Sequence, residues 1–218
     1  MTPALLLVLL VAAAVAVFVG WGLASRRRSL PCPVWLRWMV ELDNPFTRTN
    51  RAAVIVGHLG VRPGMEVLDV GCGPGRLAVP LARAVGDGGR VVAMDIQPGM
   101  LDRAREKARA AGVHNITFVR AGVGDGAPGR DRFDRALLVT VLGEIPDRDA
   151  AMREVFDALK PGGVVSVTEV VFDPHFQRRR TVERLAAAAG FAPGPCFGNR
   201  IAYTIHFTKP GDGGATGG

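Results

Sequence analysis

The first residues in this sequence that could do chemistry form a glycine-rich turn. Gly71, Gly73 and Gly75 occupy alternate positions and follow the acid Asp69, which lies in a short apolar run. Glycine permits a tight turn and lets the backbone approach a ligand closely. The helix expected after the turn would present unpaired N–H groups at its N-terminus. A turn of this kind, between a strand and a helix, predicts a site for a nucleotide-type cofactor.

A second acid lies where the sugar of such a cofactor would need it. Asp95 ends the next apolar run, at about the distance where an acid binds ribose hydroxyls. Two types of cofactor could use this arrangement. A dinucleotide fingerprint requires its third glycine one position after Gly75, and that position is Arg76. The spacing therefore disfavours a nicotinamide-dependent oxidoreductase.

Two further acids are candidates for acid–base chemistry. Glu144 follows an apolar run that predicts a fourth strand, and Glu169 lies inside the run that predicts a fifth. An acid in a buried strand is costly unless it is paired. Such acids are therefore either functional groups or members of structural ion pairs. His175, beyond the fifth run, is interpreted as an ordinary loop histidine.

Alternating helix and strand patterns position these residues. Helices are expected at 49–59, 75–85, 98–111, 147–160 and 177–189, and strands at 66–70, 90–95, 116–120, 133–141, 164–171, near 195 and at 201–207. Apolar strands that alternate with helices indicate an α/β fold whose parallel sheet is covered on both faces. Ligands of such sheets bind at the carboxyl ends of the strands, so the chemistry is expected there.

The N-terminal region predicts a membrane anchor. Ala4 to Ala24 is an uncharged apolar run, long enough at about 1.5 Å per residue to cross a bilayer core of about 30 Å. A cleaved signal peptide would need a basic start and a shorter apolar core. Arg26 to Arg28 follow the run, which predicts a single-pass membrane protein with its domain facing the cytoplasm. Trp35 and Trp38 are expected either in a short interfacial helix or as a cover packed on the domain.

Composition limits the remaining function classes. The 218 residues carry a net charge of +7, and the basic runs 26–28 and 178–180 contain no interleaved aromatic residues. A single-strand nucleic-acid platform would need such aromatics. Cys32, Cys72 and Cys196 form no CxxC, which disfavours disulfides and a metal site. The expected parts are an anchor at 1–28, a linker at 29–49, the main domain at 50–210 and a disordered tail at 211–218.

Beyond the glycine turn, three more segments resemble a known family. The GxGxG spacing after Asp69 resembles motif I of class I S-adenosylmethionine-dependent methyltransferases, of the UbiE or type 11 kind. Residues 91–96, 133–138 and 159–163 resemble that family's second strand, fourth strand and the turn before its fifth strand. The resemblance covers about residues 50–209. It implies a Rossmann-like, seven-stranded, mostly parallel sheet with helices on both faces, preceded here by one transmembrane helix.

The resemblance also implies S-adenosyl-L-methionine as the cofactor, and the residues that would hold it. Asp69 and the glycine turn would line its methionine part, Asp95 would bind the ribose and Ile96 would cover the adenine. The family often has an acid after the third strand for the adenine amino group. This sequence has Gly122 there, so Asp125 or backbone groups would take its place. The expected cofactor-binding residues are Asp69, Gly71, Cys72, Gly73, Gly75, Asp95, Ile96, Gly122 and Asp125.

The reaction expected from these features is methyl transfer to a small, hydrophobic or lipid-like acceptor at the membrane. A sulfonium methyl group is already activated, so the protein mainly aligns the acceptor and removes water. A hydroxyl acceptor would also need a base, for which Glu144 and Glu169 are the candidates. The alternatives are a soluble acceptor, or a non-catalytic cofactor-binding or scaffold protein with the same fold. A nucleic-acid substrate is disfavoured, because no NPPY-type tetrad follows the fourth strand.

Overall fold

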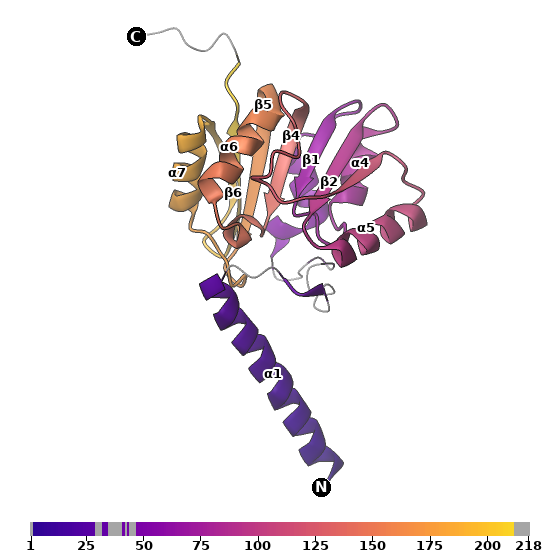
Figure 1. Cartoon of the computed structure of the whole chain (residues 1–218), viewed down its shortest axis with the longest axis vertical. Coiled ribbons are helices and arrows are strands. Elements are labelled where there is room, and N and C mark those ends of the chain that lie inside the picture. The colour runs from indigo at the N-terminus through magenta and orange to yellow at the C-terminus, as the bar shows by residue number, and fades with distance from the viewer. Residues whose placement is uncertain (1, 29–31, 35–40, 42, 44–46, 212–218) are drawn as a thin grey trace.

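The computed structural model describes residues 2–28, 32–34, 41, 43 and 47–211. Its main part is a seven-stranded sheet in the order β3-β2-β1-β4-β5-β7-β6 (Figure 1). The strands from β3 to β5 run parallel, and β7 pairs antiparallel with both β5 and β6. The expected seven-stranded, mostly parallel sheet is confirmed. The strands are β1 Glu66–Val70, β2 Arg90–Asp95, β3 Ile116–Arg120, β4 Phe133–Val139, β5 Leu159–Val170, β6 Ala192–Gly198 and β7 Ala202–Thr208.

The central strands are buried because they carry apolar side chains on both faces. All of 67–70 in β1 and all of 91–95 in β2 are buried. β1 pairs with β2 on one side and with β4 on the other. The strand order therefore reverses at β1. In sheets of this type, ligands bind beyond the carboxyl ends of the strands at this switch point.

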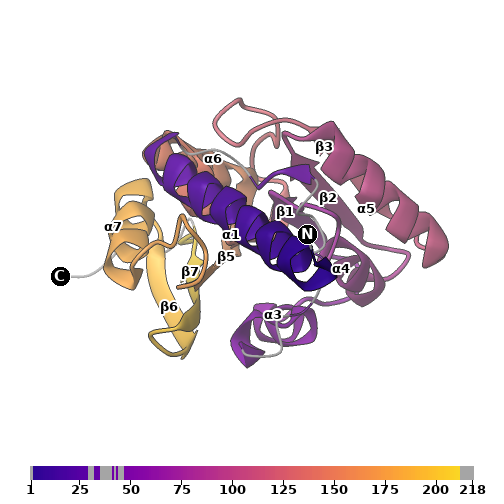
Figure 2. The ribbon, with the colours of Figure 1, turned by 90° about the horizontal axis from the view of Figure 1, so that it is seen from below.

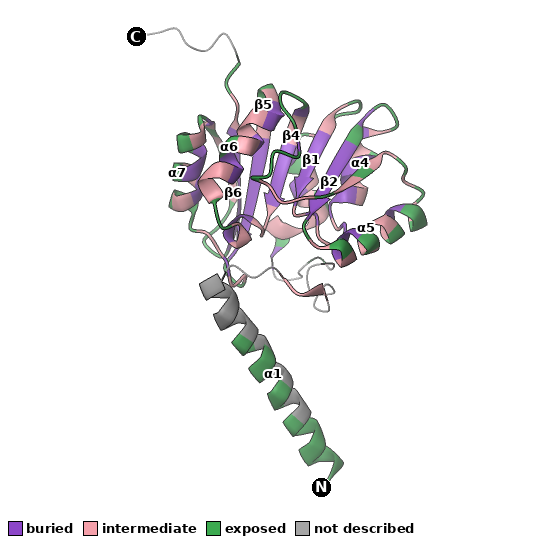
Figure 3. Cartoon of the chain, in the orientation of Figure 1, coloured by how far each residue is buried: buried purple, intermediate pink, exposed green. Residues whose placement is uncertain are grey.

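Helices cover both faces of the sheet, and Figure 2 shows α3, α4 and α5 on one side and α6 and α7 on the other. Leu68 and Val70 of β1 share a core with α6 and α7, whereas Val67 packs with α3 and α4. Successive strand residues point to opposite faces, so one strand serves both cores. Figure 3 shows the buried residues concentrated along the sheet. The helices are α3 Ala52–Leu59, α4 Ala78–Val85, α5 Pro98–Ala110, α6 Arg148–Ala158 and α7 Arg179–Ala189.

Several element boundaries differ from the sequence expectation, and glycines explain two of the differences. The helix expected from residue 75 begins at Ala78, because 73–77 are turns in which Gly73 and Gly75 have φ of 53° and 77°. The expected turn at 161–163 lies inside β5 instead of before it. The register between β4 and β5 shifts there, and Gly162 has a φ of 78°. A bulge of this kind lets the strand continue through the glycines.

The N-terminal apolar run forms α1, Pro3–Arg28, which projects away from the sheet (Figure 1). Across the part of the chain that the structure describes, no helix has both the length and the apolar character that a membrane crossing requires. A crossing needs about 20 consecutive, predominantly apolar residues. The expected transmembrane helix, the membrane location and the cytoplasm-facing orientation deduced from it are therefore wrong. The expectations for Trp35, Trp38 and residues 212–218 lie outside the described residues.

Candidate active site

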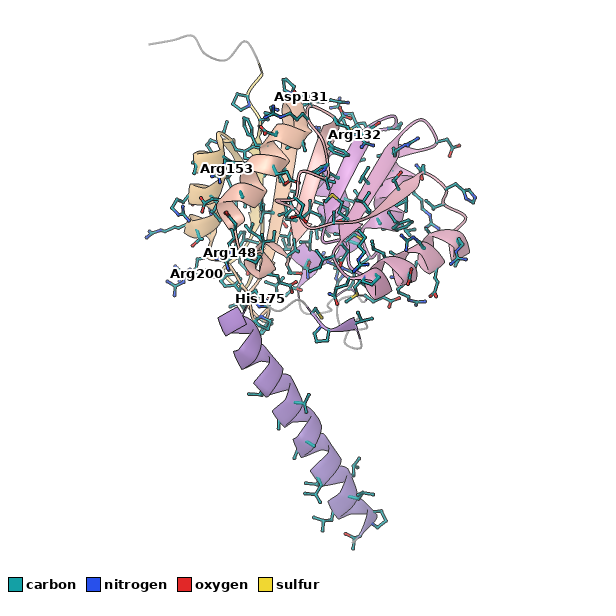
Figure 4. The ribbon with its side chains drawn as sticks, in the orientation of Figure 1. Asp131, Arg132, Arg148, Arg153, His175 and Arg200 are labelled. Carbon is teal, nitrogen blue, oxygen red and sulfur yellow. The ribbon has the colours of Figure 1, made fainter. Side chains whose placement is uncertain are left out.

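A cavity of about 400 Å³ lies at the carboxyl ends of β1, β2, β4 and β5. Its volume is within the range of about 300–1,000 Å³ that is usual for small-molecule sites. Figure 4 places Asp131 and Arg132, just before β4, at one end of the sheet and His175, after β5, at the other. The cavity is at the His175 end. Its wall comprises residues 69–74, 76–77, 94–97, 121–123, 139–141, 144–146 and 172–174, with Cys32, Asn50, Met100 and Val170.

The glycine turn after β1 forms one wall of the cavity. A Cβ added at Gly71 would lie 3.0 Å from the Cβ of Val141, and one at Gly75 would lie 2.9 Å from the Cβ of Ala104. These two glycines therefore let neighbouring elements pack against the turn. Gly73 is different, because a Cβ there would have no heavy atom within 4 Å. Since Gly73 lines the cavity, its missing side chain leaves space for a ligand.

Hydrogen bonds tie this turn to the end of β2. The N–H of Cys72 donates to the Met94 carbonyl at 2.8 Å, and the N–H of Gly73 donates to Asp95 Oδ2 at 2.9 Å. The other oxygen, Oδ1, accepts from the N–H of Gln97 at 2.8 Å. Burial raises the pKa of Asp95, and the two N–H groups oppose this rise. The carboxylate is thus fixed at the cavity wall, with lone pairs left for a ligand hydroxyl.

Asp69 brings a buried acceptor to the same wall. Its side chain is 2% exposed, and Oδ2 has no hydrogen-bond partner among the described residues. Burial raises the pKa of Asp69 to about 7, which the Arg76 charge opposes and the Asp95 charge increases. A buried carboxyl oxygen without a partner is costly. A donor group on a ligand in the cavity would satisfy it, so this residue fits a cofactor with an amino group.

The adjoining part of the wall is apolar. The Ile96 side chain is 51% exposed, and both Ile96 and Gly122 line the cavity. Asp125 is not part of the lining. Its Oδ2 accepts from the N–H of Gly122 at 3.1 Å, so this carboxylate holds its own loop. The structure therefore brings Ile96 and Gly122 to the cavity and leaves Asp125 beside it.

Arg76 occupies the position at which a dinucleotide fingerprint would have glycine. Its Nη1 pairs with Asp43 Oδ1 at 2.9 Å, and its Nη2 donates to Asn50 Oδ1 at 3.1 Å. Both Arg76 and Asn50 line the cavity. The arginine thus fastens the segment before α3 to the glycine turn.

Two acids form the opposite wall. Glu144 belongs to η3, a 3₁₀ turn at Leu142–Glu144 that follows β4, and Asp173 lies in the loop after β5. Burial, together with the charges of Asp173 and Asp95, raises the pKa of Glu144 to about 8, and the N–H of Cys32 opposes the rise. Burial also raises the pKa of Asp173, whereas the backbone N–H and the charge of His175 lower it. A carboxyl with a pKa near neutrality suits proton transfer.

Glu169, the other candidate base, does not line the cavity. It is 1% exposed in β5, and its Oε2 accepts from the N–H of Gln177 at 2.9 Å. Burial is the main cause that raises its pKa to about 8. Val170, the next residue, does line the cavity. The structure therefore brings Glu144, and not Glu169, to the wall opposite the glycine turn.

Six polar residues of the lining were not expected as site residues from the sequence: Cys32, Asn50, Arg76, Gln97, Thr140 and Asp173. Gln97 and Asp173 each follow a strand closely on its carboxyl side, and that position alone could have indicated them. Cys32 and Asn50 come from the segment before the sheet. The carbonyl of Cys32 accepts from Gln97 Nε2 at 2.9 Å. Because Cys32 and Gln97 lie far apart in the sequence, no local sequence pattern could have predicted this contact.

Known proteins similar to this chain agree with the geometry. Residues 67–163 match a family model described as a methyltransferase domain. The ubiquinone/menaquinone biosynthesis C-methyltransferase UbiE of Vibrio vulnificus is 40% identical over 119 residues, which are 53% of this chain and 46% of that protein. The chain thus spans about half the length of this relative.

Among solved structures, a SAM-dependent methyltransferase from Aquifex aeolicus superimposes with a TM-score of 0.72 at 20% identity, covering 82% of this chain and 99% of that one. The cyclase SpnF has a TM-score of 0.66 at 18% identity, covering 73% and 80%. At these identities the likeness shows the fold alone. The fold and the matched domain imply S-adenosylmethionine as the cofactor.

Proposed function

We propose that this chain, whose residues 67–163 match a methyltransferase domain, transfers a methyl group from S-adenosyl-L-methionine to a small, hydrophobic acceptor. One observation carries the proposal. A single cavity has cofactor-type acids, Asp69 and Asp95, on one wall and acids with a raised pKa, Glu144 and Asp173, on the other. A transfer reaction needs this arrangement, because donor and acceptor must meet in one space from which water is removed.

The wall with the glycine turn is assigned to the cofactor. Asp69 Oδ2 accepts from the amino group of its methionine part, for which Gly73 leaves room. Asp95 accepts from the ribose hydroxyls, and Ile96 covers the adenine. The backbone groups of Gly122 bind the edge of the adenine, where members of the family often have an acid.

The opposite wall is assigned to the acceptor, for which we infer a quinone-type ring in its reduced form. The similar Vibrio protein is named for C-methylation in ubiquinone/menaquinone biosynthesis. In support, apolar residues surround the two acids of this wall, and Phe172 beside Asp173 is 70% exposed. A reduced ring carries hydroxyl groups, and loss of a hydroxyl proton makes the neighbouring ring carbon electron-rich. The apolar residues are Val139, Val141, Ile145, Pro146, Val170 and Phe172.

Glu144 is assigned as the base in this reaction. When bound, the cofactor supplies a methyl group on a positively charged sulfur. Glu144 takes the proton of the acceptor hydroxyl, and the electron pair of that O–H bond stays on the acceptor. With the cofactor bound, the acceptor carbon would bond to the methyl carbon as the carbon–sulfur bond broke with its electron pair on sulfur. That ring carbon would then release its own hydrogen as a proton that leaves with the products, and the electron pair of the C–H bond would restore the aromatic ring. Protonated Glu144 would return its proton to the ring oxygen.

Calorimetric titration of the full chain with S-adenosylhomocysteine, and separately with NADH, tests the cofactor assignment. Micromolar binding of the first and none of the second is expected. Transfer of a labelled methyl group to a reduced short-chain benzoquinone, under anaerobic conditions, then tests the acceptor. Binding without transfer to this probe would overturn the quinone-type acceptor and favour another small molecule. Absence of binding would favour the non-catalytic alternative.

A further inference from the structure

The loops after β4 and β5 are in direct contact beside the acceptor wall. A Cβ added at Gly143 would collide with the carbonyl oxygen of His175 and lie 2.7 Å from its Cβ. Arg148 of α6 fixes the same turn, since its Nε donates to the Leu142 carbonyl at 3.2 Å and its Nη2 to the Gly143 carbonyl at 3.0 Å. Glycine at 143 is therefore required for the β5 loop to approach η3 this closely.

This contact brings the imidazole of His175 close to both acids of the acceptor wall. Its Nδ1 lies 3.7 Å from Glu144 Oε1 and 3.8 Å from Asp173 Oδ1, which are distances of an electrostatic contact and not of a hydrogen bond. The His175 side chain is only 5% exposed, whereas Glu144 is 18% and Asp173 21% exposed. The two acids line the cavity and His175 does not. Figure 4 shows His175 at the cavity end of the sheet.

The buried ring of His175 lies beside two carboxyl groups. Two neighbouring carboxyl groups with restricted access to water repel each other when both are ionised. A ring N–H between them offsets part of that repulsion. The loop is built to hold the ring, because the N–H of His175 donates to Asp173 Oδ1 at 2.7 Å and its carbonyl accepts from Gln177 Nε2 at 2.7 Å. Among the described residues, the charged or titratable groups that act on these acids include Glu144, Asp173, Asp95, Glu169, Arg148 and Cys32.

We propose that His175 is a positioning residue of the acceptor site, whose buried ring stabilises the Glu144 carboxylate at the cavity wall electrostatically. The inference rests on the proposed function, in which Glu144 takes the acceptor proton. His175 touches neither acceptor nor cofactor. When Nδ1 carries a hydrogen, the ring edge that faces Glu144 favours the ionised carboxylate, so that the base is available at lower pH than burial alone would allow.

The direct test follows the ionisation of Glu144 in the full chain without any ligand. Carbon-13 NMR of protein labelled in the glutamate carboxyls reports each titration, and the Glu144 signal is the one missing in Glu144→Gln. His175→Ala is expected to move the Glu144 midpoint to higher pH by about half a unit or more. His175→Asn, whose amide can reach the place of Nδ1, is expected to restore most of the shift. An unchanged midpoint in His175→Ala would overturn the proposal.

Methyl transfer to the reduced benzoquinone supplies the second readout. His175→Ala is expected to lower kcat about 10-fold and to move the acid limb of the pH profile to higher pH, with partial rescue in His175→Asn. S-Adenosylhomocysteine affinity should stay within two-fold of wild type, which also shows that each variant is folded. His114→Ala, at an exposed histidine, is the matched control and should change neither profile. Loss of rate with an unmoved pH limb would assign His175 a purely structural role.

Failure of this inference is distinguishable from failure of the proposed function. If wild-type protein does not bind S-adenosylhomocysteine, the proposed function fails, while the carboxyl titration still decides whether His175 acts on Glu144. If the protein binds and methylates but the titration of Glu144 is the same in His175→Ala, the inference alone fails.

Discussion

The carboxylate of Asp95 accepts two backbone hydrogen bonds and still lines the cavity. Asp95→Ala is therefore expected to weaken S-adenosylhomocysteine binding about 10- to 100-fold, since hydrogen bonds to a charged group contribute about 1.5–3 kcal/mol. Calorimetry measures this directly. Asp125→Ala is the matched control, because its carboxylate bonds only to Gly122 beside the cavity, and its affinity should equal that of wild type. Equal affinities in all three proteins would contradict the ribose assignment.

Glu144 is the residue on which the rate of transfer should depend. Glu144→Gln is expected to lower kcat about 100-fold or more, because it removes a general base, while S-adenosylhomocysteine affinity stays unchanged. In wild type the base must be ionised, and its pKa is raised to about 8. The rate should therefore rise with pH up to and through about 8. Glu169→Gln, at an acid outside the cavity, should keep both rate and profile; a loss equal to that of Glu144→Gln would reverse the two roles.

Glu144 and Glu169 also show that the sequence alone does not predict which of two similar acids reaches the cavity. Both follow or lie in apolar strand patterns, and both have a raised pKa. The side-chain alternation of β5 directs Val170 to the cavity and Glu169 away from it. Because residues 165–170 of β5 are buried on both faces, the sequence pattern does not indicate which face meets the cavity.

At the scale of elements, the turn between β1 and α4 should tolerate changes at its glycines unequally. Gly75→Ala is expected to lower the free energy of unfolding by about 2–5 kcal/mol. The alanine must adopt a left-handed φ, which costs about 1–2 kcal/mol. Its methyl group must also fit against Ala104, which costs about 1–3 kcal/mol. Gly73→Ala has the φ cost alone, but its methyl group would enter the cavity and weaken S-adenosylhomocysteine binding. Urea denaturation and calorimetry separate the two effects. Equal destabilisation would contradict the packing at Ala104.

Local patterns predicted most elements well, and the exceptions have physical causes. The expected strands at 66–70, 90–95 and 116–120 have the observed bounds, because each is an apolar run between turn residues. Helix α4 starts late and β5 starts early, since positive-φ glycines permit both a longer turn and a bulge. The contribution of Cys32 and Asn50 to the cavity depends on contacts with Gln97 and Arg76, far along the chain, which no local period encodes.

At the scale of the whole molecule, the apolar N-terminal run shows that the local structure of a segment can be predicted correctly while its role is not. Its composition correctly predicted a helix, α1. The step from helix to membrane anchor fails, because no helix among the described residues meets the requirement for a crossing. The fold was predicted with more success, since the strand, the glycine turn and the following helix together indicated the observed sheet.

Buried acids near the carboxyl end of the sheet should make the stability of the whole domain depend on pH. The pKa is about 7 for Asp69 and about 8 for Glu144 and Glu169, mainly through burial. In the unfolded chain these acids titrate near pH 4. Between these values the folded state binds more protons, so its stability is fully present below about pH 4 and is lost as pH rises to about 8.

The free energy of unfolding without ligand should therefore fall from pH 5.5 to pH 8, by up to about 1.4 kcal/mol per pH unit for each such acid. Glu169→Gln removes one of these acids without touching the cavity, and is expected to make the fall shallower and to stabilise the protein at pH 8. Urea denaturation at both pH values measures this. Glu106→Gln, whose side chain is 58% exposed, is the matched control and should keep the wild-type slope. A Glu169→Gln slope equal to that of wild type would mean that Glu169 is ionised in the fold, held by the N–H of Gln177 despite its burial.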